Sequence, residues 1–346
     1  MALLTVTSPH AHGPSSTTWV MQQVALATLP GLFALTWFFG FGTLVNVIWA
    51  IICGIGFEAL SLKIRKRPIA FYLKDYSAIV TAILLGLAVP PYAPWWVVFV
   101  GMAFAIFVAK QLYGGIGYNP FNPAMVAYVI LLISLPVQMT QWGKPVELDG
   151  SFIGPIEAFL NNFGFSESLD GRTAATPLDI MKQNSSLMME QLYSENNVFG
   201  SFGGIGWEWA NAGFLLGGIY LMSRRIFTWH APISMLIALT LCALIGYDGG
   251  SSNSGGSPAF HLLSGATMLG AFFILTDPVS SAVSNRGRIV FGACIGVLIY
   301  IIRVYGAYPD AVAFSVLLMN FAAPFIDHYT QPRTYGHKKD QSKGGK

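Results

Sequence analysis

Long apolar runs separated by short polar connections dominate this sequence. Ten of the runs approach the length of a membrane-spanning helix, which needs roughly 20 mostly apolar residues. Only 10% of the residues are charged, whereas a soluble globular protein carries about 25%. So few charges cannot cover a water-facing surface, which excludes a soluble enzyme, a disordered chain and a nucleic-acid-binding protein. The sequence therefore predicts an all-α polytopic protein surrounded by membrane lipid. The predicted spans are residues 22–41, 43–62, 76–90, 93–110, 122–138, 204–222, 230–246, 259–276, 288–303 and 310–327.

The basic residues predict how these spans are oriented. If the N-terminus is cytoplasmic, the even-numbered connections and the C-terminal tail are cytoplasmic as well. They hold 15 of the 19 Lys and Arg residues, and the outer connections hold four. Because Lys and Arg in short loops gather on the cytoplasmic side, we expect both termini in the cytoplasm.

One outer connection, residues 139–203, is far longer than the others. It carries eight acidic residues against three basic ones. Loops longer than about 12–15 residues are usually functional or disordered. At this point two interpretations stay open, a floppy acidic insert and a functional segment.

The two halves of the chain resemble each other. NPAMVAYVILL, from Asn122, aligns with YPDAVAFSVLL, from Tyr308, at a constant offset of 186. At an offset of 187, Ser77 aligns with Ser264. Five spans per repeat is an odd number, so the second copy would be inverted. Inverted repeats are typical of transporters, with the functional site at the repeat interface, and a small-solute channel or transporter is therefore the alternative function.

This repeat divides the chain into five predicted parts. They are a cytoplasmic N-terminus (1–21), a first five-helix repeat (22–138), the large outer loop (139–203), a second five-helix repeat (204–327) and a basic cytoplasmic tail (328–346).

Within the outer loop, DGRTAATPLDIMK spans residues 170–182. Pro177 disfavours the α region for Thr176 and favours extended backbone there. Ala174 and Ala175 are small, so we expect the Thr176 hydroxyl to stand out on an accessible, strand-like segment. Such a hydroxyl is suited to covalent modification by another protein, and an ordinary turn is the alternative.

The pattern Asp-Gly-x-Thr-x-Ala-Thr-Pro-Leu in this segment resembles the flavinylation motif of the NqrB/RnfD family, the large membrane flavoproteins of the Nqr and Rnf respiratory complexes. The resemblance extends over nearly the whole chain. It includes YNPFNPA at 118–124, SGATMLGAFFILTDPVS at 264–280 and NFAAPFIDHYTQPRTYG at 320–336.

The resemblance implies that a flavin transferase links FMN through its phosphate to Thr176. The motif neighbours carried over with it are Asp170, Gly171, Thr173 and Ala175.

The chain departs from the family motif at Ala174, where the family usually has Gly. A second tetrapeptide, residues 264–267, matches the family pattern Ser/Thr-Gly-Ala-Thr better. Thr176 is nevertheless favoured over Thr267, because Asp170 precedes it by six residues while His261 holds that place before Thr267. Thr267 is also followed by an unbroken apolar run, where small residues are typical of close helix packing.

For function, the resemblance implies a membrane flavoprotein subunit of an Rnf/Rsx-type complex of the bacterial inner membrane. Covalent FMN on the periplasmic loop would carry electrons in a ferredoxin- or NAD-linked reaction, while the complex moves Na⁺ or H⁺. It implies partner subunits that hold iron–sulfur clusters and flavin, and a further, non-covalent riboflavin. We identify no independent catalytic site and no metal site, since the three cysteines stand singly in apolar runs. An unmodified scaffold is a third interpretation.

A few polar residues lie within or beside the predicted spans. Ionisable residues inside a membrane are functional candidates by default, but Glu58, Lys110 and Glu208 lie near span ends, and we expect them to reach lipid headgroups. Asp277 is expected to cap or break a helix end. Its segment and residues 119–123 are polar and interrupted by proline, which predicts the lining of a cavity for an ion or a flavin.

Overall fold

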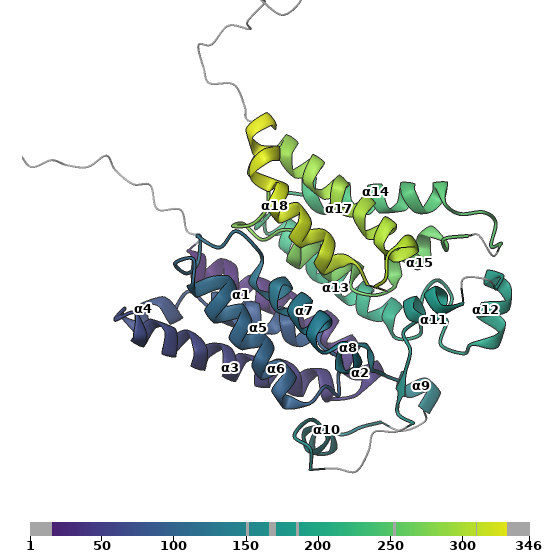
Figure 1. Cartoon of the computed structure of the whole chain (residues 1–346), viewed down its shortest axis with the longest axis horizontal. Helices are drawn as coiled ribbons and strands as arrows, with labels where there is room; N and C mark the ends of the chain where they lie inside the picture. The colour runs from purple at the N-terminus through teal and green to yellow at the C-terminus, as the bar shows by residue number, and fades with distance from the viewer. Residues whose placement is uncertain are drawn as a thin grey trace, which may run out of the picture.

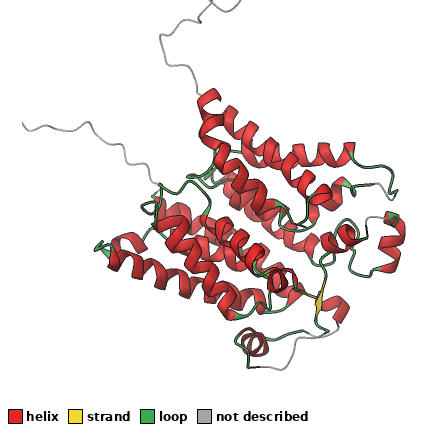
Figure 2. Ribbon diagram, in the orientation of Figure 1, coloured by secondary structure: helices red, strands yellow, loops and turns green. Residues whose placement is uncertain are grey.

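The computed structural model describes residues 16–149, 152–165, 171–184, 187–251, 254–308 and 310–330. Most of the described chain is helical, in agreement with the predicted all-α class (Figure 2). A helix overlaps each of the ten predicted spans. Asp170, one of the predicted motif residues, lies outside the described residues.

The N-terminal half forms one bundle of helices (Figure 1). The first predicted span is divided at Thr28 into two helices, and Pro30 occupies the second position of the second one, where its missing N–H is tolerated. The elements are α1 (Thr17–Ala27), α2 (Leu29–Phe39), α3 (Gly42–Ile64), α4 (Ile69–Leu73), α5 (Ser77–Ala88), α6 (Trp95–Ala103), the π-helix η1 (Phe104–Gln111), α7 (Pro123–Ser134) and α8 (Pro136–Thr140).

The C-terminal half forms a second bundle beside the first (Figure 1). Its third predicted span is broken at residues 264–266, between α15 and α16. The elements are α13 (Trp207–Ser223), α14 (His230–Ile245), α15 (Pro258–Leu263), α16 (Thr267–Leu269), the π-helix η2 (Gly270–Ile274), α17 (Asn285–Tyr305) and α18 (Val312–Thr330).

The long connection between the bundles has its own secondary structure. Its strands pair antiparallel, with Trp142 opposite Ala174. Leu178, Ile180 and Leu192 form a small apolar cluster with Phe260 of α15. The described part of this connection is therefore packed, and the floppy-insert interpretation is wrong for it. The elements are β1 (Trp142–Gly143), α9 (Val146–Asp149), α10 (Pro155–Asn162), β2 (Thr173–Ala174), α11 (Pro177–Gln183) and α12 (Met189–Glu195).

The two bundles pack together through equivalent helices. α2 packs on α13, and α7 packs on α18. Gly213 of α13 lies so close to the backbone at Pro30 that an added Cβ would meet its carbonyl oxygen at 2.7 Å, which is the close approach that small residues permit in membranes. α7 and α18 carry the aligned sequences and pack against each other, and the inverted repeat stays a prediction.

Connections that are predicted to lie on the same side of the membrane meet at one end of the molecule. α1 begins and α18 ends at that end, while α9 to α12 lie at the opposite end (Figure 1). Thr18 donates to the carbonyl of Lys74 at 2.8 Å, and the Arg224 guanidinium lies 5.5 Å from the centre of the Trp19 ring. This grouping supports the predicted topology. The assignment of that end to the cytoplasm stays a prediction from charge.

Within the part of the chain that the structure describes, four helical segments are long and apolar enough to cross a bilayer: Thr17–Phe39, Gly42–Ile64, Asn285–Tyr305 and Val312–Thr330. The same described residues include four shorter apolar helices: Ser77–Ala88, Trp95–Gln111, Pro123–Ser134 and His230–Ile245. The chain is a membrane protein, and a total of ten crossings stays a prediction.

Candidate functional site

Thr176 is the N-cap of α11, with the extended backbone (φ −70°, ψ 158°) that Pro177 favours. Its hydroxyl donates to the Asp179 carboxylate at 2.6 Å and accepts from the Asp179 N–H at 3.2 Å. The Thr176 N–H donates to the same carboxylate at 3.2 Å, which completes a capping box. The predicted extended backbone is thus confirmed, but the half-buried hydroxyl does not stand out, because Asp179 holds it.

The other described motif residues shape the backbone before Thr176. Gly171 has φ +93°, a left-handed conformation that glycine adopts without strain. Thr173 pairs with Gly143 in the short sheet, as the predicted strand-like segment requires. Ala175 packs against the small apolar cluster of the connection.

Lys182 fixes α11 to the second bundle. Its ammonium donates to the carbonyl oxygens of Tyr308 at 2.8 Å, Ile302 at 3.2 Å and Arg303 at 3.3 Å. Two of these carbonyls belong to the last turn of α17, where a cation is favoured by the helix dipole. Burial lowers the pKa of Lys182, and the nearby Asp179 charge opposes that shift.

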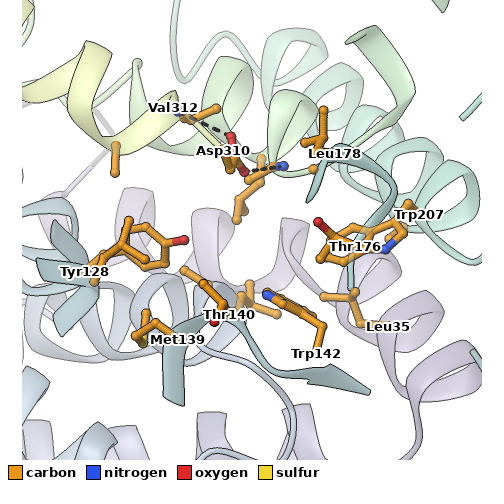
Figure 3. A pocket seen from close by; sticks show the side chains of 18 of the residues that line it. Leu35, Tyr128, Met139, Thr140, Trp142, Thr176, Leu178, Trp207, Asp310 and Val312 are labelled. Atoms are coloured by element: carbon orange, nitrogen blue, oxygen red, sulfur yellow. Dashed lines mark hydrogen bonds between the residues drawn. The ribbon is translucent and has the colours of Figure 1, made fainter. Parts of the chain in front are cut away.

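Thr176 lines a cavity between the two bundles (Figure 3). Asp179 lines the same cavity. Most of its wall is apolar and comes from both bundles, with Leu35 of α2, Trp207 of α13 and Val312 of α18 among the contributors. Five side chains with polar atoms line it besides Thr176 and Trp207: Tyr128, Thr140, Trp142, Asp179 and Asp310.

The two carboxylates of this cavity differ in how their charges are balanced. Asp310 is paired with the Arg303 guanidinium at 3.3 Å and accepts from the Ala266 N–H at 3.0 Å. Burial raises the pKa of Asp179; the hydrogen bonds from Thr176 oppose this, and the charge of Asp310 adds to it. Asp179 is therefore a stronger proton acceptor than an ordinary aspartate of the surface.

Thr267, the alternative attachment residue, is fully buried. Its hydroxyl donates to the carbonyls of His261 at 2.8 Å and Ser264 at 3.0 Å, and accepts from Arg303 at 3.0 Å. The tetrapeptide of residues 264–267 therefore forms the break between α15 and α16 and the first residue of α16.

A second cavity lies between the bundles on the side of the termini. Asn119, Asn122 and Asp277 line it, together with Ser77 and Lys110. Both segments predicted to line a cavity contribute to this one, through Asn119, Asn122 and Pro123 and through residues 277–279; an ion or a flavin in it stays a prediction. Asp277 follows the end of η2, as expected of a helix-ending residue, and accepts from the Ser280 hydroxyl at 2.6 Å.

The expectation that Glu58 and Lys110 reach lipid headgroups is wrong. They form an ion pair at 3.0 Å, with each side chain only 3% exposed. Lys110 also donates to Ser77 at 2.8 Å, and Gln111 donates to Glu58 at 2.6 Å. Burial of both charges is possible because each neutralises the other.

Glu208, also expected to reach lipid headgroups, has hydrogen-bond partners within the protein. It accepts from the backbone N–H groups of Phe202 at 2.8 Å and Gly203 at 2.7 Å, so it orders the turn before α13.

Sequence reasoning missed five polar side chains of the cavity beside Thr176: Tyr128, Thr140, Trp142, Asp179 and Asp310. Only Asp179 had a local signal, because Thr-x-x-Asp before an apolar run resembles a capping box. The others come from segments far apart in the sequence, and only the packing of the two bundles brings them together.

Comparison with known proteins gives a consistent result over the whole length. Residues 4–336 match the model of the NQR2, RnfD, RnfE family. A protein of Cellvibrio japonicus, named as the D subunit of an ion-translocating oxidoreductase complex, is 57% identical over 98% of this chain and 96% of its own length. Proteins of the same name from Ectopseudomonas mendocina and Aliivibrio salmonicida are 56% and 51% identical, over 99% and 98% of this chain and over 98% and 100% of their own lengths. The chain therefore belongs to the NQR2, RnfD, RnfE family.

Proposed function

We propose that this chain is the membrane flavoprotein subunit of an ion-translocating oxidoreductase complex and carries electrons on FMN esterified to Thr176. The family match supports the complex, and the position of Thr176 at a cavity between the bundles supports the attachment site. Iron–sulfur and flavin subunits would be its partners, a flavin transferase would load it, and the loop would face the periplasm from the bacterial inner membrane. The electron transfer would be ferredoxin- or NAD-linked and coupled to Na⁺ or H⁺.

The residues around Thr176 suit a flavin. Flavin rings are flat and mostly apolar, and ligand sites of this kind combine apolar and aromatic walls with a few polar groups. Trp142 and Trp207 lie with ring centres 4.7 Å apart at the cavity wall. The interior measures about 80 Å³, well below the roughly 300–1,000 Å³ of small-molecule pockets, so its walls have to move before a tricyclic ring enters fully.

When bound, FMN would supply the redox chemistry, and the protein would supply position and electrostatics. Attachment through the phosphate leaves the ring free to meet an electron donor and an acceptor. The contact of Lys182 with α17 would hold the attachment point against the second bundle. The apolar wall would exclude water from the ring.

The second cavity is where we would place the non-covalent riboflavin. It is lined by amide, hydroxyl and charged groups, among them Asn119, Asn122 and Lys110, which can pair with the polar edge of a flavin. Among the described residues, no lining residue is shared by the two cavities. Two separate cavities favour two bound cofactors over the continuous pore of a solute channel.

The first test is in-gel flavin fluorescence with intact mass on the full chain, co-expressed with its flavin transferase. Wild type should fluoresce and carry one FMN, and Thr176→Ala should be dark. The matched control is Thr267→Ala, which should fluoresce like wild type. A dark wild-type band would contradict the proposal, and fluorescence that survives in Thr176→Ala would move the site elsewhere.

A further inference from the structure

We propose that Asp179 is the proton acceptor for the covalent modification of Thr176, so that the chain supplies part of the chemistry of its own flavinylation. This inference rests on the proposed function, because it concerns the same hydroxyl. A threonine hydroxyl is a weak nucleophile until a neighbouring base takes its proton. The flavin transferase would then bind and activate the flavin donor, while the acceptor chain supplies the base.

The geometry satisfies the first requirement of a general base, which is hydrogen-bond reach of the proton it removes. The Thr176 hydroxyl already donates to Asp179 Oδ2 at 2.6 Å. One lone pair of the hydroxyl oxygen accepts the Asp179 N–H at 3.2 Å, and the other is left for attack. The capping box thus fixes both the direction of the proton and the direction of the nucleophile.

The surroundings leave Asp179 free to act as a base. Lys182, one helical turn later, interacts with the charge of Asp179, but its ammonium donates to the carbonyl oxygens of Ile302, Arg303 and Tyr308. Among the described residues, no ion pair to Asp179 is formed. Partial burial at a cavity wall further favours uptake of a proton by the carboxylate.

The attachment of flavin to Thr176 is a balanced reaction when the flavin donor carries its phosphate in a phosphoanhydride. Thr176 Oγ1 attacks the flavin-bearing phosphorus, and the new oxygen–phosphorus bond forms. The anhydride bond breaks, and the departing nucleotide phosphate takes its electron pair. The hydroxyl proton passes to Asp179 Oδ2, and nothing is oxidised or reduced. The protonated Asp179 then places no negative charge beside the new phosphodiester, which an ionised carboxylate would repel.

The experiment measures the initial rate of flavin attachment to the purified full chain in detergent, with FAD and a flavin transferase, by in-gel fluorescence. Asp179→Asn keeps a side-chain oxygen that can accept the Thr176 N–H but cannot take a proton at neutral pH. We expect its rate to fall about 100- to 10,000-fold, the usual contribution of a general base. Glu190→Gln, an exposed position in α12, is the matched control and should react like wild type.

Two readouts separate a chemical role from a structural one. The ratio of wild-type to Asp179→Asn rates should grow as the pH rises through the pKa of Asp179, because only the wild type gains an ionised base. Asp179→Ala should recover rate on addition of formate, a small carboxylate that can replace the missing base but not the capping box.

The outcomes are distinct. An Asp179→Asn rate within about threefold of wild type, or an Asp179→Ala rate that formate leaves unchanged, would overturn the role of Asp179 while leaving the attachment site intact. A wild-type chain that takes up no flavin would overturn the proposed function and this inference with it.

Discussion

Replacing Lys110 by methionine should destabilise the first bundle strongly, because it would leave Glu58 buried without its counter-ion. Both side chains are 3% exposed and their charged atoms are 3.0 Å apart. Removing one partner of a buried ion pair typically costs about 3–5 kcal/mol, since the remaining charge keeps its desolvation cost. Gln111 still donates to Glu58 in the variant and offsets part of that cost.

The double variant Glu58→Gln with Lys110→Met carries no buried charge, so it should be more stable than Lys110→Met alone. The measurement is the melting midpoint of detergent-solubilised protein, followed by fluorescence-detected gel filtration. Lys110→Met should melt several degrees lower than wild type, and the double variant should recover most of the loss.

The control is the exposed ion pair between Arg172 and Glu157, whose side chains are 39% and 45% exposed. Exposed pairs contribute about 0–1 kcal/mol, so Glu157→Gln should shift the melting midpoint little. If Lys110→Met melts like wild type, or if the double variant melts no higher than Lys110→Met, this prediction is wrong. In either case the two buried charges do not depend on each other.

Three further predictions concern the segment that carries Thr176. Lys182→Met removes three contacts to carbonyl oxygens, so limited proteolysis within residues 171–184 should become faster, whereas Lys182→Arg should keep most of the protection. Gly171→Ala should cost about 1 kcal/mol or more in local stability, because alanine is strained at φ +93° although its Cβ would meet nothing within 4 Å; faster proteolysis of the same segment would register it, and unchanged cleavage would contradict it. The raised pKa of Asp179 means that the folded segment binds a proton more tightly than the unfolded one, so its stability is highest below the ordinary aspartate pKa of 3.8 and falls as the pH rises through the raised value. Hydrogen exchange of the α11 amides, corrected for intrinsic rates, should show this fall in wild type and not in Asp179→Asn.

The bundle could be predicted from the sequence because its signals are local. Apolar length located helices at all ten predicted spans, and Pro177 correctly predicted the extended backbone at Thr176. These features depend on a residue and its near neighbours, where steric and hydrophobic rules hold whatever the rest of the chain does.

The partners of the buried charges could not be predicted in the same way. Lys110 was placed near a membrane boundary because it lies at the end of an apolar run, but Glu58 of α3 meets it from 52 residues away. Similarly, Asp310 reaches the cavity of Thr176 only because α7 and α18 pack together. A single sequence gives no signal for such pairings.

Two buried cations occupy related places in the two predicted repeats. Lys110 and Arg303 are the last residues of the fourth and ninth predicted spans, which correspond in the two predicted repeats, although the two residues are 193 positions apart and the aligned segments are offset by 186 and 187. Each donates to the start or the break of the preceding predicted span, Lys110 to the hydroxyl of Ser77 and Arg303 to the carbonyl of Ser264. These two serines are the pair aligned at an offset of 187.

The two cations lie at opposite ends of the molecule. Lys110 contacts Ser77, shortly after Lys74, at the end where α1 begins. Arg303 lies at the other end, where its carbonyl oxygen accepts from Lys182 of α11. A direct repeat would place both cations at the same end, and an inverted one places them at opposite ends. Their carboxylate partners come from different places in the fold, Glu58 in α3 for Lys110 and Asp310, before α18, for Arg303. The shared feature is therefore a buried cation that donates to a serine of the preceding predicted span. At the end that carries Thr176, the carboxylate paired with that cation lines the proposed flavin cavity.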